Sequence, residues 1–256
     1  GEVLEGEGGG VIWAPHWYDV VPLVAKSFRS WIGIAHFEKK LNPYKPPLVL
    51  GRERVARENA AKLMALKGIA RKIGRRGCPT VIGEIGIPFN MNEGESFRTG
   101  NFDLQTSAMD SSLRAVEDSL VHATIWNYTA DNSNRYGDGW NGEDLSIFCA
   151  DQHYDLQDIF SGGRALPAVI RPYPMRTAGD PMEIKFDVRD RIFYFRFCHD
   201  PDCSAPTIIF LPFFQYPKEP RVKVSDGNVE IKNLQQCLIY HHDPRYAEHS
   251  ISIVPS

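Results

Sequence analysis

A single glutamate, Glu84, stands at the end of a short apolar run and is bracketed by glycine and proline. Val81 and Ile82, which precede it, suit a strand that is buried on both faces. Gly86 lets the backbone bend and approach other segments closely where such a strand ends. Because enzymes built on buried parallel strands carry catalytic groups at the carboxyl ends of those strands, the pattern predicts a catalytic carboxylate. The alternative is a glutamate that caps the next helix, since short motifs often match by chance.

Two further strand-like runs, at residues 11–14 and 123–126, also end in polar and aromatic residues. A loop rich in Asp, Asn and Gly follows the second run to about residue 151. The side chains at these ends that could bind a ligand are His16, Tyr18, Trp126, Asn127, Trp140, Asn141 and Glu143. Sugar rings present C–H faces that pack on aromatic rings, and their hydroxyls need carboxylates, amides and imidazoles. The composition therefore predicts a carbohydrate site; for residues 131–144 the alternative is a solvated surface loop.

Strands and helices alternate over the first 170 residues. The predicted elements are strands at 11–14, 80–84 and 123–126, helices at 54–76 and 102–122, and a glycine- and asparagine-rich loop from the second strand to residue 101. The apolar residues that recur at helical spacing in the first helix include Val55, Leu63 and Ile69. This alternation is typical of parallel β/α units, in which the loops after the strands meet on one face. Three strands cannot close a barrel, which needs eight, and they leave buried-type edges unpaired. The chain opens with an acidic, glycine-rich stretch without methionine, so we expect an N-terminal part that supplies the missing strands.

The pattern changes after about residue 171 to many short strands with closely spaced turns. Those strands are predicted at 182–188, 191–197, 207–211, 221–224, 229–231, 234–240 and 250–254. A tight turn at Arg189-Asp190 joins the first two, and Asp226-Gly227 predicts a hairpin. Such a succession describes an antiparallel β-sandwich. We therefore divide the chain into an α/β domain at residues 1–170 and an all-β domain at 171–256.

Composition excludes several classes of protein. The formal net charge of -3 provides no basic stripe of the kind that nucleic-acid-binding domains carry. The five cysteines are an odd and sparse set, which argues against a disulfide-built secreted scaffold. Cys198 and Cys203 could pair, or could bind a metal with His199. We prefer two thiols that flank a turn, because no second ligand pair of the usual spacing exists.

Three motifs resemble glycoside hydrolase family 5, and most closely its glycolipid-cleaving branch of endoglycoceramidases, fungal glucosylceramidases and steryl-β-glucosidases. The motifs are Ala-Pro-His-Trp-Tyr-Asp at 14–19, Ile-Gly-Glu-Ile-Gly-Ile-Pro at 82–88, and Trp-Asn-Tyr-Thr with Gly-Asp-Gly-Trp-Asn-Gly-Glu-Asp-Leu-Ser-Ile at 126–147. Arg171-Pro-Tyr-Pro174 looks like the entry to the closing β-sandwich domain of those enzymes. The resemblance implies the carboxyl-terminal half of such an enzyme: strands 6–8 of a (β/α)8 TIM barrel, followed by the antiparallel β-sandwich.

The same resemblance implies a retaining β-glucosidase with Glu84 as its nucleophile. His16 and Tyr18 would line the site, the Tyr18 hydroxyl would bond the nucleophile, and Trp126 would form the floor under the sugar. The further substrate contacts that it implies are Asn127, Trp140, Asn141 and Glu143.

A second carboxylic acid must protonate the leaving oxygen from about 5 Å away. In the family it sits in an Asn-Glu-Pro motif, which this sequence lacks. We therefore expect the acid on the N-terminal half of the same enzyme, and the chain alone to be inactive. Glu143 and Asp138 are the weaker alternatives. No metal and no other cofactor is expected, because two carboxylates suffice.

The expected substrate is a glucosylated lipid, first a steryl (ergosteryl) β-glucoside and next glucosylceramide. Residues 20–50 read as an insertion with broken helices, which could form an apolar wall or lid for the lipid. A transient contact of the protein with a membrane surface is also expected. Its apolar residues are Phe28, Trp31, Ile32, Ile34 and Phe37. Ordinary packing of this insertion is the alternative. A family 5 glucanase acting on soluble glucans and a non-enzymatic sugar-binding module are the competing functions.

Overall fold

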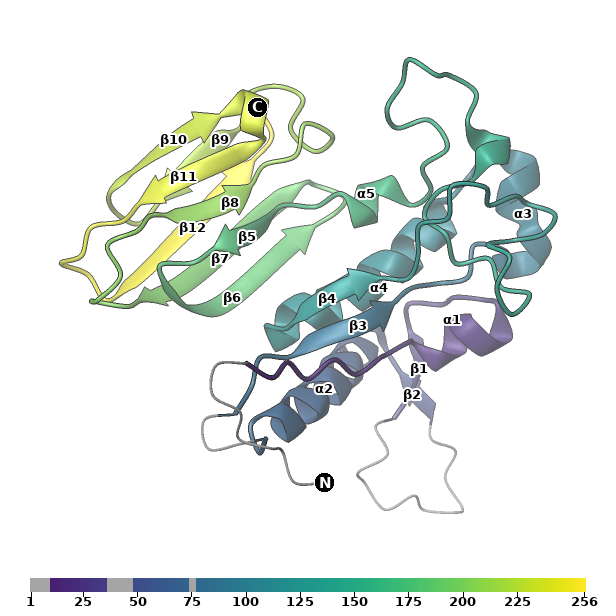
Figure 1. The fold of residues 1–256 in the computed structure, drawn as a ribbon, viewed down its shortest axis with the longest axis horizontal. Coiled ribbons are helices and arrows are strands. Elements are labelled where there is room, and N and C mark those ends of the chain that lie inside the picture. Colours follow the sequence, from purple (N-terminus) through teal and green to yellow (C-terminus); the bar gives the residue numbers. More distant parts are fainter. Residues whose placement is uncertain (1–9, 36–47, 74–76) are drawn as a thin grey trace. The chain divides into compact units, whose positions relative to one another are not determined.

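The computed structural model describes residues 10–35, 48–73 and 77–256. The chain divides into two compact units, Gly1–Leu166 and Pro167–Ser256, which are described separately below (Figure 1). The first contains parallel β/α structure and the second is built from antiparallel strands. The predicted succession of an α/β part and an all-β part is therefore present.

A parallel ladder forms the centre of the first unit. Strands β3 (Val81–Ile85) and β4 (His122–Ile125) pair in parallel, and the segment 13–16 runs along the other side of β3 (Figure 1). That segment is joined to β3 by the isolated parallel bridges Trp13↔Thr80 and His16↔Glu84. The prediction of a regular strand at 11–14 is thus wrong in detail, because only single bridges form there. Because the three segments run parallel to one another, their carboxyl ends lie at one edge of the ladder.

Two long helices pack against each other beside this ladder, α2 (Arg52–Ala70) and α4 (Asp103–Ser119). One apolar cluster joins helices and ladder, and its buried members are Trp17, Leu63, Ile82, Ile85 and Ala115. Helix α2 ends earlier than predicted, and Ile69, expected in its core face, is 45% exposed. No helix in the described ranges is both long and apolar enough to cross a membrane.

Among the described residues, the outer members of the ladder have no strand partner on one side. In the described parts of the chain β4 pairs with β3 alone, and its side chains alternate between exposed and half-buried. Val11 and Ile12, on the opposite side of the ladder, are 45% and 59% exposed. Bare edges with apolar side chains are a hazard that proteins normally cover.

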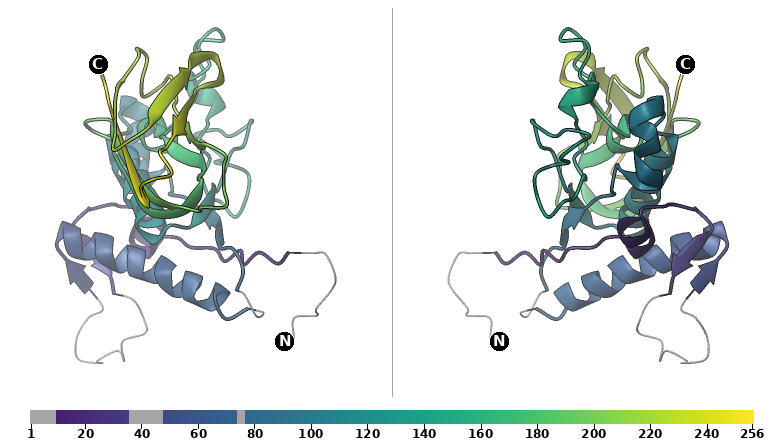
Figure 2. Two further views of the ribbon diagram at one scale, coloured as in Figure 1. Left: turned by 90° about the vertical axis from the view of Figure 1, so that its left-hand side faces the viewer. Right: turned by 90° about the vertical axis from the view of Figure 1, so that its right-hand side faces the viewer.

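The segment predicted as broken helices has mixed structure. It forms the short helix α1 (Val20–Ala25) and a two-stranded antiparallel ladder of β1 (Ile32–Ile34) and β2 (Leu48–Leu50). This ladder lies against the start of α2, where Gly33 meets Val55 (Figure 2). The predicted apolar residue Phe37 lies outside the described residues.

A loop was predicted at residues 90–101, but the structure has helix α3 (Met91–Thr99) there. Asn92, Glu93 and Gly94 adopt left-handed backbone angles near its start. The glycine and asparagine content that predicted a loop is used for this distorted first turn. A single 3₁₀ turn, η1 (Ala150–Gln152), follows in the first unit. The short helix α5 (Leu166–Val169) begins at the last residue of that unit and continues into the second.

The second unit consists of two four-stranded antiparallel sheets, ordered β10-β11-β8-β5 and β6-β7-β12-β9. The strands and one 3₁₀ turn are β5 (Tyr173–Arg176), β6 (Gly179–Asp187), β7 (Ile192–His199), β8 (Thr207–Phe210), β9 (Arg221–Val224), β10 (Asn228–Lys232), η2 (Asn233–Gln235), β11 (Cys237–His241) and β12 (Glu248–Val254). All seven predicted strands have a counterpart, whereas β5 was not predicted because Pro174 interrupts its pattern.

The core of this unit lies between the two sheets. Phe193, Phe195 and Phe197 alternate along β7 and are fully buried, as are Leu238 and Tyr240 from the facing sheet. Phe195 and Phe197 stack with ring centroids 5.4 Å apart. Two inner faces that contribute alternate residues to one core define a sandwich.

Two turns in the sandwich were predicted, with opposite outcomes. Arg189-Asp190 joins β6 to β7 as an antiparallel hairpin, which confirms the prediction. Asp226-Gly227 does not form a hairpin, because β9 and β10, which it connects, belong to different sheets. Gly227 has φ 64°, and a Cβ there would lie 2.0 Å from the carbonyl oxygen of His241. The glycine is thus required for a close crossing between sheets. The thiols of Cys198 and Cys203 are free.

Candidate functional site

Glu84 lies near the carboxyl end of β3, and two side chains from the segment beside that strand reach its carboxylate. The hydroxyl of Tyr18 donates a hydrogen bond of 2.9 Å to Oε2 of Glu84. The Nδ1 atom of His16 lies 3.2 Å from the same oxygen. The Glu84 side chain is 24% exposed, so the carboxylate remains accessible. The structure therefore brings together three of the residues selected from the sequence.

The residues on both sides of Tyr18 are anchored, which fixes Tyr18 in this position. The amide of Trp17 donates to the carbonyl oxygen of Glu84 at 3.0 Å, and the Trp17 side chain is buried. Asp19 is also buried and caps α1 by accepting from the amide of Val21. Its other oxygen accepts from Asn59 on α2 at 3.2 Å. Because both of its neighbours are anchored, Tyr18 needs little ordering to bond the carboxylate.

Trp126 follows β4 at the same edge of the ladder. Its amide donates to the carbonyl oxygen of Ile85 at 2.9 Å. A Cβ on Gly86 would lie 2.1 Å from the carbonyl oxygen of Trp126 and 3.6 Å from the Tyr18 ring. Only glycine allows this approach, so the two strand ends and Tyr18 form one continuous surface.

The carboxylate of Asp138 organises the loop that follows. It accepts hydrogen bonds from the side-chain amide of Asn127 at 3.0 Å and from the backbone amides of Trp140 and Leu145. The amide of Glu143 donates to the carbonyl oxygen of Trp140 at 2.8 Å. Asn127, which was predicted to contact substrate, is therefore held by Asp138. Asp138 itself was predicted only as an alternative proton donor.

A buried ion pair holds the base of this loop. The guanidinium of Arg164 and the carboxylate of Asp144 bond to each other, and both side chains are almost completely buried. Asp144 also accepts from Asn132, and Arg164 donates from Nε to the carbonyl oxygen of Ser146. The guanidinium lies 4.2 Å from the centroid of the Phe89 ring. Sequence reasoning missed Arg164, since an arginine in a polar stretch gives no sign of burial.

The charges of the site act on one another. Burial raises the pKa of Glu143, and the charges of Asp138 and Glu84 raise it further, while Lys26 opposes them. Burial also raises the pKa of Tyr18, and its bond to Glu84 adds to this effect. Tyr18 therefore keeps its proton at neutral pH and remains a donor. Glu143 is close enough to Glu84 to sense its charge, although no hydrogen bond joins them among the described residues.

Trp140 and Asn141 are the most weakly supported of the predicted site residues. The Trp140 side chain is 59% exposed, and Asn141 is also exposed. Within the described ranges, neither hydrogen-bonds to the carboxylate of Glu84. The structure thus places them on the loop that carries Glu143 without joining them to the catalytic candidate.

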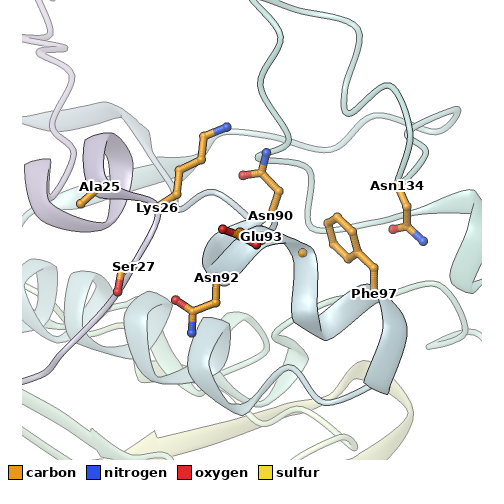
Figure 3. Close-up of a pocket in the computed structure, with 9 residues that line it drawn as sticks. Ala25, Lys26, Ser27, Asn90, Asn92, Glu93, Phe97 and Asn134 are labelled. Atoms are coloured by element: carbon orange, nitrogen blue, oxygen red, sulfur yellow. The ribbon is translucent and has the colours of Figure 1, made fainter.

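A cavity of about 560 Å³ lies between the end of α1, the start of α3 and the polar loop. Figure 3 shows Lys26 and Phe97 on opposite sides of it, and Asn134 reaches it from the loop. Its lining is mainly polar, which suits hydroxyl groups better than an apolar lipid. Glu84, His16 and Tyr18 are not among its lining residues.

Comparison with known proteins finds similarity in both units. Residues 171–253 match the family model described as glycoside hydrolase family 5 C-terminal domain. The chain is 29% identical over 251 residues to a glucosylceramidase of Rhizopus delemar, in a match that spans 91% of this chain and 36% of that protein. It is 25% identical over 292 residues to an ergosteryl-beta-glucosidase of Saccharomyces cerevisiae, across 91% of this chain and 38% of that protein.

A solved structure is also similar to this chain over most of its length. The fold matches the crystal structure of Cryptococcus neoformans sterylglucosidase 1 with a TM-score of 0.86 and 28% identity, over 96% of this chain and 38% of the other. The chain therefore spans little more than a third of the length of each of these proteins. The matches confirm the resemblance to glycoside hydrolase family 5 and its glycolipid-cleaving members.

The buried Arg164–Asp144 ion pair leads to a prediction about the stability of a variant at Arg164. Arg164→Met should lower the free energy of unfolding by about 3–5 kcal/mol, because it leaves the Asp144 carboxylate buried without its partner. Urea unfolding followed by fluorescence measures this. The matched control is Arg135→Met at an exposed position, where a change within about 0.5 kcal/mol is expected. Equal stability of the two variants would contradict a structural role for the pair.

Proposed function

We propose that this chain supplies the nucleophile side of a retaining β-glucosidase acting on glucosylated lipids. Its second unit matches the glycoside hydrolase family 5 C-terminal domain, and most of its length is similar to a fungal glucosylceramidase and a sterylglucosidase. The observation that supports this most directly is the accessible Glu84 carboxylate, held through Oε2 by Tyr18 and His16. Carboxylates at the ends of parallel strands are the usual catalytic groups of such enzymes.

The three parallel segments of the first unit correspond, in this proposal, to strands 6–8 of a (β/α)8 barrel. Their bare outer edges support it, because strands of this buried type need neighbours on both sides. The remaining strands belong to an N-terminal part of the same enzyme, which also supplies the general acid. This part is the partner that the site requires.

Catalysis then proceeds by double displacement. Oε1 of Glu84 attacks the anomeric carbon, the bond from that carbon to the leaving oxygen breaks, and the acid of the N-terminal part donates its proton to that oxygen. A covalent glucosyl-enzyme ester results. The same acid, now a base, removes a proton from water, whose oxygen attacks the anomeric carbon and releases Glu84 as a carboxylate. Tyr18 and His16 hold Oε2, so Oε1 is presented to the sugar in one orientation.

The other site residues bind the sugar in this proposal. Trp126 packs under the ring, while Asn127, fixed by Asp138, offers its amide to a hydroxyl. Glu143 accepts from further hydroxyls, and Trp140 and Asn141 complete the loop side of the site. The raised pKa of Glu143 is a property that a proton donor would also have, so its role needs a direct test.

An apolar surface near the site supports a lipid aglycone. Val20 and Val24 lie on one face of α1 and are 49% and 74% exposed, and Trp31 and Leu50 are 45% and 56% exposed on the neighbouring ladder. The carbonyl oxygen of Trp31 accepts from Gly51, which places Trp31 beside Leu50. A steryl β-glucoside is the first candidate substrate and glucosylceramide the second, and this surface could also touch a membrane.

The nucleophile is tested by Glu84→Gln in the complete enzyme. The amide keeps the shape of the side chain but cannot form the ester, so kcat should fall by roughly 10⁴-fold or more. Hydrolysis of an aryl β-glucoside measures this, with unfolding curves showing that the fold is intact. Glu53→Gln, at an exposed position on α2, is the control and should retain activity. Normal turnover by the Glu84 variant would refute the assignment.

The role of Glu143 is separated by the pH dependence of Glu143→Gln. If Glu143 binds hydroxyl groups, KM should rise while the fall of kcat/KM at high pH remains, because that limb reports the general acid elsewhere. If Glu143 is the acid, the fall of kcat/KM at high pH should disappear. The rate should then drop most for the aryl glucoside with the poorer leaving group. Rates between pH 4 and pH 9 on two aryl glucosides with different leaving groups distinguish these outcomes.

The substrate class is tested by comparing steryl glucoside, glucosylceramide and soluble β-glucan oligosaccharides with the complete enzyme. We expect kcat/KM to be highest for the lipid substrates. Val24→Ser and Trp31→Ala should lower kcat/KM for lipids by about 10-fold, with little effect on an aryl glucoside, since each removes apolar contact area. A preference for soluble glucans, unaffected by these substitutions, would favour the glucanase alternative.

A further inference from the structure

Three histidines meet at one end of the β-sandwich. His199 ends β7, His249 lies in β12 and His242 follows β11. Strands β7 and β12 are neighbours in one sheet, whereas β11 belongs to the facing sheet. The three imidazoles therefore join the two layers of the sandwich.

The nitrogen atoms of these rings are spaced like metal ligands. One ring nitrogen from each histidine lies within 4.8 Å of the other two. Nδ1 of His199 and Nε2 of His249 are 3.0 Å apart, and the rings of His242 and His249 have centroids 4.5 Å apart. Zn–N bonds of about 2.0–2.1 Å in a tetrahedral site place ligand atoms about 3.3 Å apart. Only a small inward movement of the side chains is needed to reach that geometry.

His249 is oriented as a metal-binding histidine usually is. Its side chain is 1% exposed, and its Nδ1 atom lies 2.9 Å from the carboxylate of Asp226. Asp226 itself accepts from the hydroxyl of Ser225 and the backbone amide of Asp243. When this carboxylate accepts a hydrogen bond from the Nδ1–H group of His249, Nε2 carries the lone pair that can bind a cation.

His242 supplies the second line of evidence. Its Nδ1 atom is buried and has no hydrogen-bond partner among the described residues. A buried nitrogen without a partner costs stability, and imidazole nitrogens are common zinc ligands. The contact between His199 and His249 could alone be a hydrogen bond, but that leaves His242 unexplained.

We propose that His199, His242 and His249 form a binding site for a zinc-like divalent cation that ties the two sheets of the sandwich together, with Asp226 positioning His249. Three imidazoles suit a borderline-soft cation such as Zn²⁺, with water as the fourth ligand. The site stabilises the domain and takes no part in glycoside hydrolysis. It is therefore independent of the function proposed above.

Titration calorimetry with ZnCl₂ on chelator-treated protein tests the site. We expect one zinc ion to bind per chain. His199→Gln and His242→Gln should weaken binding by more than the roughly 10- to 100-fold expected for Asp226→Asn, which removes only the positioning group. His241→Gln is the matched control, because His241 is exposed and adjacent to His242. It should bind zinc like the unaltered protein.

Thermal unfolding provides a second readout that does not depend on activity. Saturating zinc should raise the Tm of the unaltered protein and of His241→Gln by about 5 °C or more. The His199 and His242 variants should unfold at similar temperatures with and without zinc. Without metal, all four proteins should give cooperative transitions, which shows that the variants fold. Absence of saturable binding by the unaltered protein, or equal binding by His242→Gln, would overturn the proposal.

Discussion

The hydrogen bond from Tyr18 to Glu84 depends on most of the first unit being in place. It joins residues 66 positions apart in the chain, which meet only because the segment 13–16 runs parallel to β3. The bond holds one carboxylate oxygen and leaves the other for chemistry. Buried Trp17 and Asp19 anchor the donor on either side, and Asp19 is bonded to α2 through Asn59. The site is therefore positioned by packed elements rather than by a loop alone.

The polar loop after β4 is ordered in a different way. The Asp138 carboxylate accepts hydrogen bonds from backbone and side-chain amides of the loop. Asp144 and Arg164 form a buried ion pair at the base of the same loop. Desolvating two charges offsets much of their attraction, so this pair fixes one conformation more than it adds stability. The same loop carries Glu143, whose pKa is raised by burial and by the negative charges of Asp138 and Glu84.

Much of this arrangement could be predicted from local patterns in the sequence. The carboxyl-end position of Glu84, the two long helices and the seven sandwich strands follow from periodicity and from glycine and proline. Arg164 could not be found in this way, because its burial is decided by partners 18 and 20 residues away. The histidine cluster was hidden for the same reason, since its members lie in or directly after three strands that belong to two sheets. Asp226-Gly227 suggested a hairpin because local turn chemistry does not show which sheet receives the next strand.

The central claim is that Glu84 becomes covalently bonded to the anomeric carbon of glucose. A 2-deoxy-2-fluoro-glucoside with a good leaving group slows release of the intermediate more than its formation, so the labelled enzyme accumulates. Peptide mapping by mass spectrometry after incubation of the complete enzyme locates the sugar. The account predicts one glucosyl label, on the peptide that contains Glu84. A label on Glu143, Asp138 or a residue outside this chain would contradict it.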